Sequence, residues 1–215
     1  MSRTLMVFCF LVGICFMNPA RAQDEQNLQP WWFGLEFGIG QLGLTATQSD
    51  IVDLQPNLPL EQFPKNRRTF AAGLFGGHRL GRRARIGLEV NGWLLEAGNL
   101  NDPSRGELVS NASAVVDVFP VRKVPFFIRA GAGAATYENH HELGFGGTGW
   151  AWTVGGGYEF RLSRNMGLAP IVGYASGNFG DVHDILAVET GRRYSVVELK
   201  VAVIFHVGKT HRKAH

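Results

Sequence analysis

Ionisable side chains recur inside otherwise apolar segments of the sequence, on the parity opposite to a run of bulky residues. In residues 85–95, RIGLEVNGWLL, Arg85 and Glu89 alternate with Ile86, Leu88 and Val90. Charges of both signs on one face could line a conductive pathway, or they could pair with each other in a structural ion network. The residues that fit this pattern are Glu36, Arg85, Glu89, Asp117, Arg129, Glu159, Arg161, Glu198 and Lys200.

Two other groups contain the residue types needed for metal binding or hydrolysis. The segment ENHHE at 138–142, together with Asp181, His183 and Asp184, supplies metal-type ligands, but no pair has a rigid spacing. Ser176, His183 and Asp184 could form a hydrolytic triad if the histidine activated the serine. Neither group has a supporting motif, so we expect no catalytic residue, no metal site and no cofactor.

The N-terminal residues 1–22 have the layout of a cleaved secretory signal. Arg3 precedes an apolar run, and small residues lead up to a cleavage site after Ala22. Both cysteines of the chain, Cys9 and Cys15, lie in this leader. The mature chain is therefore expected to have no disulfide, no thiolate metal site and no cysteine nucleophile.

The composition of the mature chain gives no reason to expect nucleic-acid binding. Two of the 21 basic residues lie in the leader, and the remaining 19 face 18 acidic ones. Glycine is frequent, at 28 residues, without a collagen-like period. No apolar run after the leader is long enough to predict a transmembrane helix.

After residues 23–30, a short N-terminal segment, the chain divides into segments of alternating character separated by turn signals. Tight turns alternate with longer, polar loops at 47–68, 97–106, 139–147 and 178–192. This order of connections predicts an all-β fold, an eight-stranded antiparallel up-and-down β-barrel over residues 31–207, followed by a basic tail at 208–215. The expected strands are 31–46, 69–79, 83–96, 107–119, 124–138, 148–162, 166–177 and 193–207.

The two faces of these strands predict which side is inside the barrel. The bulky face is uniformly apolar, whereas the opposite face is mainly glycine and charge. A narrow barrel interior suits glycine and paired ions, and a uniformly apolar outer wall suits lipid. We therefore expect a transmembrane barrel with an ion network inside, and we favour a structural network over a pore because eight strands enclose room for side chains only.

Aromatic residues on the outward face are expected to form two belts at the membrane interfaces. One belt lies near the tight turns and the other near the long loops. The predicted belt residues are Trp31, Phe33, Phe126, Trp150, Trp152, Tyr158, Phe160, Tyr174 and Phe205.

The chain resembles the eight-stranded outer-membrane β-barrel family of Gram-negative bacteria, the group of the OmpA transmembrane domain, OmpX and the opacity-type surface proteins. The resemblance covers the mature chain and is most recognisable in residues 147–181, GTGWAWTVGGGYEFRLSRNMGLAPIVGYASGNFGD. The last strand also carries Glu198, Val203 and Phe205 in the manner of the family's assembly signal.

The resemblance implies an outer-membrane location with periplasmic termini, and a structural or surface-exposed role without enzymatic activity. Envelope integrity, adhesion and loop-mediated binding are the roles that it suggests. The implied partners are outer-membrane lipids and lipopolysaccharide, the outer-membrane assembly machinery and cell-surface ligands of the long loops. A lipid A-modifying enzyme and a narrow solute channel are the alternatives.

Overall fold

The protein is described by a computed structural model over residues 29–45, 48–51, 65–96, 106–121, 124–139, 145–183 and 187–208. None of these residues forms a helix with the length and apolarity needed to cross a membrane. The strands are β1 (Trp31–Thr45), β2 (Gln48–Ile51), β3 (Lys65–Leu80), β4 (Ala84–Glu96), β5 (Glu107–Val118), β6 (Phe126–Asn139), β7 (Phe145–Tyr158), β8 (Phe160–Arg161), β9 (Met166–His183) and β10 (Ala187–Val207).

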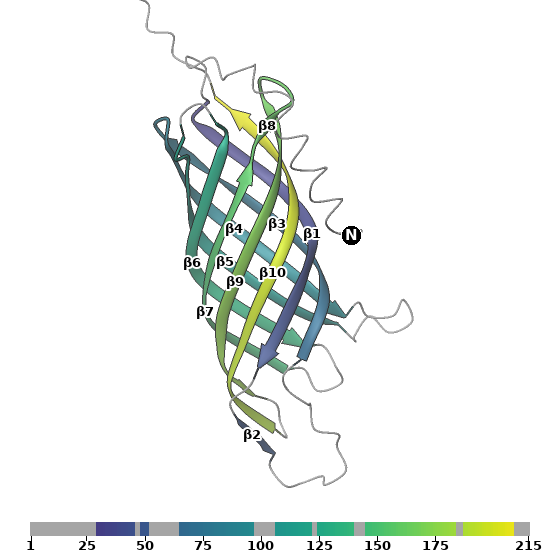
Figure 1. The fold of residues 1–215 in the computed structure, drawn as a ribbon. Coiled ribbons are helices and arrows are strands. Elements are labelled where there is room, and N and C mark those ends of the chain that lie inside the picture. Colours follow the sequence, from purple (N-terminus) through teal and green to yellow (C-terminus); the bar gives the residue numbers. More distant parts are fainter. Residues whose placement is uncertain are drawn as a thin grey trace, which may run out of the picture.

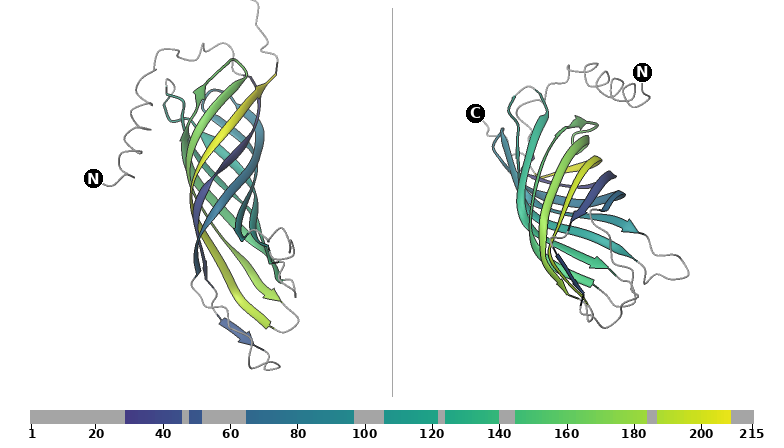
Figure 2. Two further views of the ribbon diagram at one scale, coloured as in Figure 1. Left: turned by 90° about the vertical axis from the view of Figure 1, so that its right-hand side faces the viewer. Right: turned by 60° about the horizontal axis from the view of Figure 1, so that its bottom comes forward.

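Eight long strands close into an antiparallel barrel (Figure 1). Each long strand pairs with its neighbour along the chain, and β1 also pairs with β10 from Trp31 opposite Val207 to Thr45 opposite Arg193. The strands are long and inclined, as both views in Figure 2 show. The predicted fold, an eight-stranded up-and-down β-barrel, is therefore confirmed.

The connections differ between the two ends of the barrel. The start of β1, the end of β10 and the short turns lie at one end, and Gly81 takes the positive φ of 69° that the turn between β3 and β4 requires. The longer connections join strands at the other end, and most of their residues lie outside the described ones. We call these two ends the turn end and the loop end.

Several strands differ in length from those expected. β3 begins at Lys65, β9 continues to His183 and β10 begins at Ala187, so most of the expected loop at 178–192 is a hairpin. The expected strand at 148–162 is interrupted at Glu159 and continues as the short β8. The four-residue β2 pairs with the start of β10 inside the expected first loop. The extensions of β3, β9 and β10 and the additional β2 lie at the loop end, where bulky residues no longer alternate with small ones.

Burial alternates along the strands, because successive side chains point to opposite faces. Leu88 on β4 is 69% exposed, whereas Val115 on the neighbouring β5 is 1% exposed. The bulky aliphatic and aromatic residues counted as outward-facing in the sequence are the exposed ones, and the charged face is buried. The apolar wall of the barrel therefore faces its surroundings.

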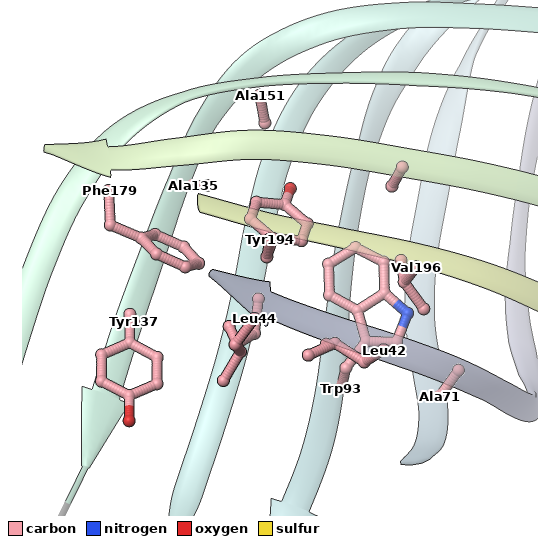
Figure 3. Packing of buried hydrophobic residues seen from close by; sticks show 12 residues of the cluster. Leu42, Leu44, Ala71, Trp93, Ala135, Tyr137, Ala151, Phe179, Tyr194 and Val196 are labelled. Carbon is pink, nitrogen blue, oxygen red and sulfur yellow. The ribbon is translucent and has the colours of Figure 1, made fainter. Parts of the chain in front are cut away.

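The interior contains more than glycine and charge, which corrects the expectation from the sequence. An outer aromatic cluster, at the loop end, is built around Trp93, Tyr137, Phe179 and Tyr194 (Figure 3). An inner aromatic cluster, at the turn end, consists of Trp32, Phe75, Phe119, Phe127, Ala169, Ile171, Ala202 and Ile204. In the sequence, an inward aromatic residue often stands next to an outward one, as Trp32 does beside Trp31. Comparison of alternate positions therefore does not reveal the inward aromatic residues.

Glycines give the charged side chains the space that they occupy. Gly73 pairs across the ladder with Glu36, and a Cβ on it would lie 3.0 Å from the Glu36 carboxylate oxygen. Gly173 pairs with Glu198, and a Cβ there would lie 2.9 Å from a carboxylate oxygen of that residue. The abundance of glycine on the inward face thus follows from the size of the ions packed against it.

Leu88→Arg tests which face meets lipid. Leu88 lies in the middle of the exposed apolar wall, so an arginine there should cost about 2–4 kcal/mol of unfolding free energy in a bilayer. The control is Val121→Arg in the turn between β5 and β6, where Val121 is 50% exposed and we expect a cost of about 0–1 kcal/mol. Urea unfolding of both variants in lipid vesicles measures the difference, and equal costs would contradict an outward-facing lipid wall.

Candidate functional site: an ion network inside the barrel

The structure places all nine predicted ionisable residues in one continuous network. They come from β1, β4, β5, β6, β8 and β10 and from Glu159 between β7 and β8. Eight of them are buried, and Arg161 is partly exposed at the turn end. The network lies between the inner and outer aromatic clusters, so the interior is filled in three layers.

Arg129 is the centre of the network. Its Nε donates to Asp117 Oδ1 at 2.8 Å, and its Nη2 donates to Asp117 Oδ2 at 3.3 Å. Its Nη1 donates to Glu89 Oε2 at 2.6 Å and lies 3.7 Å from Glu36 Oε2. The guanidinium of this one residue therefore joins three carboxylates from three different strands.

Arg85 and Glu159 extend the network toward the turn end. The two terminal nitrogens of Arg85 lie 3.1 Å from Asp117 Oδ2 and 2.9 Å from Glu159 Oε2. Glu159 Oε1 in turn lies 2.9 Å from both Arg161 Nε and His206 Nε2. The Glu159 carboxylate therefore contacts groups on β4, β8 and β10 at once.

Lys200 extends the network toward the loop end. Its Nζ forms a short contact with Glu36 Oε1 and lies 2.6 Å from Glu198 Oε1. Glu198 Oε2 accepts a hydrogen bond of 2.8 Å from the indole Nε1 of Trp93. The outer aromatic cluster is therefore hydrogen-bonded directly to the ions beneath it.

The inner aromatic cluster contacts the same ions through its ring faces. The Arg85 guanidinium lies 4.6 Å from the ring centroid of Trp32 and 4.7 Å from that of Phe119. The Arg129 guanidinium lies 4.9 Å from the ring centroid of Phe75. Cation–π attraction of this kind strengthens when water is excluded, as it is between these buried groups.

Three members of the network were not predicted from the sequence. His206 contacts Glu159, Asn91 contacts both Glu89 and Lys200, and Trp93 contacts Glu198. His206 shares the inward parity of Glu198 and Lys200, which is the signal that could have identified it. The contacts of Asn91 with Lys200 and of Trp93 with Glu198 join β4 to β10 across the interior, and these strands are separated by β1 and β3, so no local spacing indicates the contacts.

A second, smaller polar group lies at the loop end of the interior. Tyr137 donates a hydrogen bond of 2.7 Å to Glu107 Oε1, and Arg67 Nη1 lies 3.5 Å from Glu107 Oε2. The Arg192 guanidinium lies 4.1 Å from the centroid of the Tyr137 ring. These contacts cover the outer aromatic cluster on its loop side.

The predicted interface aromatics all lie on the outward parity. Trp31, Phe33, Phe126, Trp150 and Trp152 are between 37% and 59% exposed. The other four are partly buried against neighbours on the same wall: Tyr158 packs on Phe160, Phe33 on Phe205 and Trp152 on Tyr174. Their position in two belts at membrane interfaces remains a prediction.

A ring of polar outward-facing residues marks the end of the apolar wall on the loop side. On β5 and β6 the ring is formed by Ser110 and Thr136, whose hydroxyl oxygens lie 2.6 Å apart. On β1, β3, β7, β9 and β10 the polar residue follows the last bulky one directly, whereas on β5 Leu108 lies beyond Ser110, and β4 has no described member of the ring. The ring residues are Gln41, Arg68, Ser110, Thr136, Thr148, Ser176 and Ser195.

The residues considered for hydrolysis and metal binding are not brought together among the described side chains. The Ser176 hydroxyl donates a hydrogen bond of 2.9 Å to the carbonyl oxygen of Tyr194. Asp184 and residues 140–142 lie outside the described residues, as do the side chains of Asp181 and His183. Within the described part of the chain, no group of three histidine, cysteine or acidic side chains could hold a metal ion.

Comparison with solved structures gives outer-membrane barrels. Neisserial surface protein A is 15% identical over 80% of this chain and 96% of its own, with a TM-score of 0.49. OprG from Pseudomonas aeruginosa is 12% identical over 85% and 99%, with a TM-score of 0.45. Ail of Yersinia pestis is 10% identical over 83% and 100%, with a TM-score of 0.45. The sequence matches no protein-family model and no curated protein.

The fold is a closed eight-stranded transmembrane β-barrel. This assignment rests on the closed topology of the chain and on its exposed apolar wall.

Arg129→Leu tests the importance of the centre of the network. The substitution leaves Asp117 and Glu89 without their main counter-charge in a buried setting, so we expect a loss of about 3–5 kcal/mol in unfolding free energy. Arg161→Leu is the matched control, because Arg161 pairs with a single carboxylate at the partly exposed rim and should cost about 1 kcal/mol or less. Denaturant unfolding in vesicles measures both, and similar small losses would show that the network does not stabilise the barrel.

Proposed function

We propose that this protein is a small integral outer-membrane β-barrel with a structural or surface-exposed role and no enzymatic activity. The observation that supports this role is the filled interior. Ions and aromatic side chains from every long strand except β7 occupy it in three layers, and the largest of these side chains are almost fully buried. The outer wall and the loop end are then the surfaces left for contacts with other molecules.

The exposed wall supports a membrane environment. Bulky apolar residues that are 40–69% exposed, such as Ile39, Leu74, Leu88 and Val197, cover the outside of the barrel. A continuous apolar surface of this kind would promote aggregation in water, whereas lipid requires it. A closed barrel also satisfies every backbone hydrogen bond of the ladder within a bilayer.

The two ends of the barrel support an orientation. A cleaved secretory leader would deliver the chain to the periplasm, where the assembly machinery of the outer membrane would insert it. Both ends of the barrel domain, Trp31 and Val207, lie at the turn end, which we place in the periplasm. The loop end then faces the cell exterior.

The extended hairpin at the loop end supports a surface role. β10 continues for eight residues from Ser195 to Ala187, beyond the polar ring, which is roughly 26 Å of strand. β9 and β2 pair with this extension. A paired sheet that projects from the membrane suits envelope contacts, adhesion or binding of ligands through the loops.

Heat-modifiable migration tests the membrane barrel itself. Protein from the outer-membrane fraction should migrate faster on a gel when it is not boiled, because the closed hydrogen-bond ladder resists detergent. The same chain after boiling is the internal control. Recovery of the protein in the soluble periplasmic fraction, with no shift on boiling, would contradict the proposal.

Conductance in planar bilayers tests the filled interior. We expect no resolved single-channel steps, because an eight-stranded interior occupied by side chains leaves no continuous water path. The double variant Phe179→Ala/Tyr194→Ala, which thins the outer aromatic cluster, should also remain silent because the ion network lies beneath it. A sixteen-stranded porin in the same bilayers is the positive control, and discrete steps from the unaltered protein would favour a solute channel.

A further inference from the structure

A basic polar patch lies on the outside of the barrel directly beyond the apolar wall at the loop end. It spans the adjacent strands β3, β1 and β10 and consists of Arg68, Arg193, Asn66, Gly43 and Ser195. The two arginines and Asn66 are exposed, and all five residues have the outward parity of their strands. We call it the β3–β1–β10 patch.

Gly43 forms the floor of this patch. It pairs across the ladder with Asn66 on one side and with Ser195 on the other. A Cβ on Gly43 would lie 3.0 Å from Asn66 Oδ1 and 3.4 Å from Ser195 Oγ, so the glycine leaves room for these two polar side chains beside it. Next to this glycine the Ser195 hydroxyl can donate a hydrogen bond to an incoming group, whereas Asn66 presents its acceptor oxygen.

The arginines lie on opposite sides of this floor. Arg68 pairs with Gln41 and Arg193 pairs with Thr45, so along β1 they are separated by about 13 Å with Gly43 between them. The outward residues below the patch on the same strands are apolar: Phe70, Ile39 and Val197, which are 53%, 66% and 57% exposed. The headgroup of a ligand bound to the patch would thus contact two positively charged arginines, and the rest of the ligand would lie against an apolar surface.

We propose that the β3–β1–β10 patch binds the phosphorylated headgroup of a lipid in the outer leaflet. Arginine guanidinium groups form paired, charge-assisted hydrogen bonds with phosphate oxygens. The acyl chains of the same lipid would lie along the apolar wall below. A soluble polyanion would use the charge of the patch and leave that wall without a role, which is why a lipid is favoured. This proposal rests on the membrane location argued above.

The patch belongs to one side of the barrel. At a comparable level on β6 the exposed outward residue is Glu138. A phosphate would be repelled by a carboxylate, so binding should be confined to the β3, β1 and β10 side rather than form an even shell of lipid around the protein.

The experiment measures binding of bisphosphorylated lipid A to the full-length, detergent-folded barrel by native mass spectrometry. Arg68→Gln/Arg193→Gln should weaken binding by about thirtyfold. This is about fivefold for each arginine, the loss of affinity expected when one basic group is removed at a membrane surface. The matched control is Arg82→Gln/Arg83→Gln in the turn at the opposite end, which removes the same charge and should leave binding unchanged. Heat-modifiable migration confirms that each variant is folded.

Three outcomes overturn the proposal. The first is equal weakening by both double variants, which would mean general charge attraction. The second is undiminished binding of dephosphorylated lipid A, which would mean that the phosphates are not recognised. The third concerns competition for the unaltered patch. If a soluble sulfated polysaccharide displaced lipid A more strongly than excess inorganic phosphate did, a surface polyanion would be identified as the ligand. In each case heat-modifiable migration would be retained, so the membrane barrel itself would not be in question.

Discussion

The closing of an eight-stranded sheet creates a narrow interior that must be filled, and the rest of this structure depends on how it is filled. An interior of this width holds side chains rather than bulk water. Charged groups placed there need partners, because an uncompensated buried ion costs several kcal/mol. The barrel meets this requirement with a network in which Arg129 and Lys200 each contact carboxylates from more than one strand. The aromatic clusters on either side exclude water and hold the ions through an indole hydrogen bond and through ring faces.

The same closure determines the outside. Once the polar groups are gathered inside and every long strand is paired on both sides, the outer surface can be apolar without exposing unsatisfied backbone. Except on β4 and β5, the apolar wall ends on the loop side at a ring of hydroxyl, amide and guanidinium groups. Above that ring the outward residues no longer need to be bulky, and β9, β10 and β2 continue as a projecting sheet. Inside and outside are thus two consequences of a single alternation along the strands.

The alternation is visible in the sequence, and for that reason the fold, the outward face and nine charged members of the ion network could be predicted from it. The partners within the network could not, because they depend on how far the register shifts around the closed barrel: Arg85 meets Glu159 from the far side of the sheet, and no local spacing encodes that pairing. The inward aromatics were missed because doublets such as Trp31 with Trp32, and Phe126 with Phe127, cancel the contrast between parities. The strand ends beyond the polar ring were missed because no lipid boundary requires bulky residues there.

Ions in the interior, instead of apolar residues alone, are explained by the need to fix the strand register rather than by a gain in stability. Buried ion pairs are commonly no more stabilising than well-packed apolar residues of similar volume. They do penalise misassembly, because a slip of one residue in any ladder would turn every inward side chain of that strand toward lipid. For β6 or β10 such a slip would place Arg129 or Lys200 on the lipid-facing wall, at a cost of about 2–4 kcal/mol near the bilayer midplane. An interior of leucine and valine would carry no such penalty, since it would suit lipid equally well. The charged residues therefore distinguish inside from outside in an environment where apolar burial cannot.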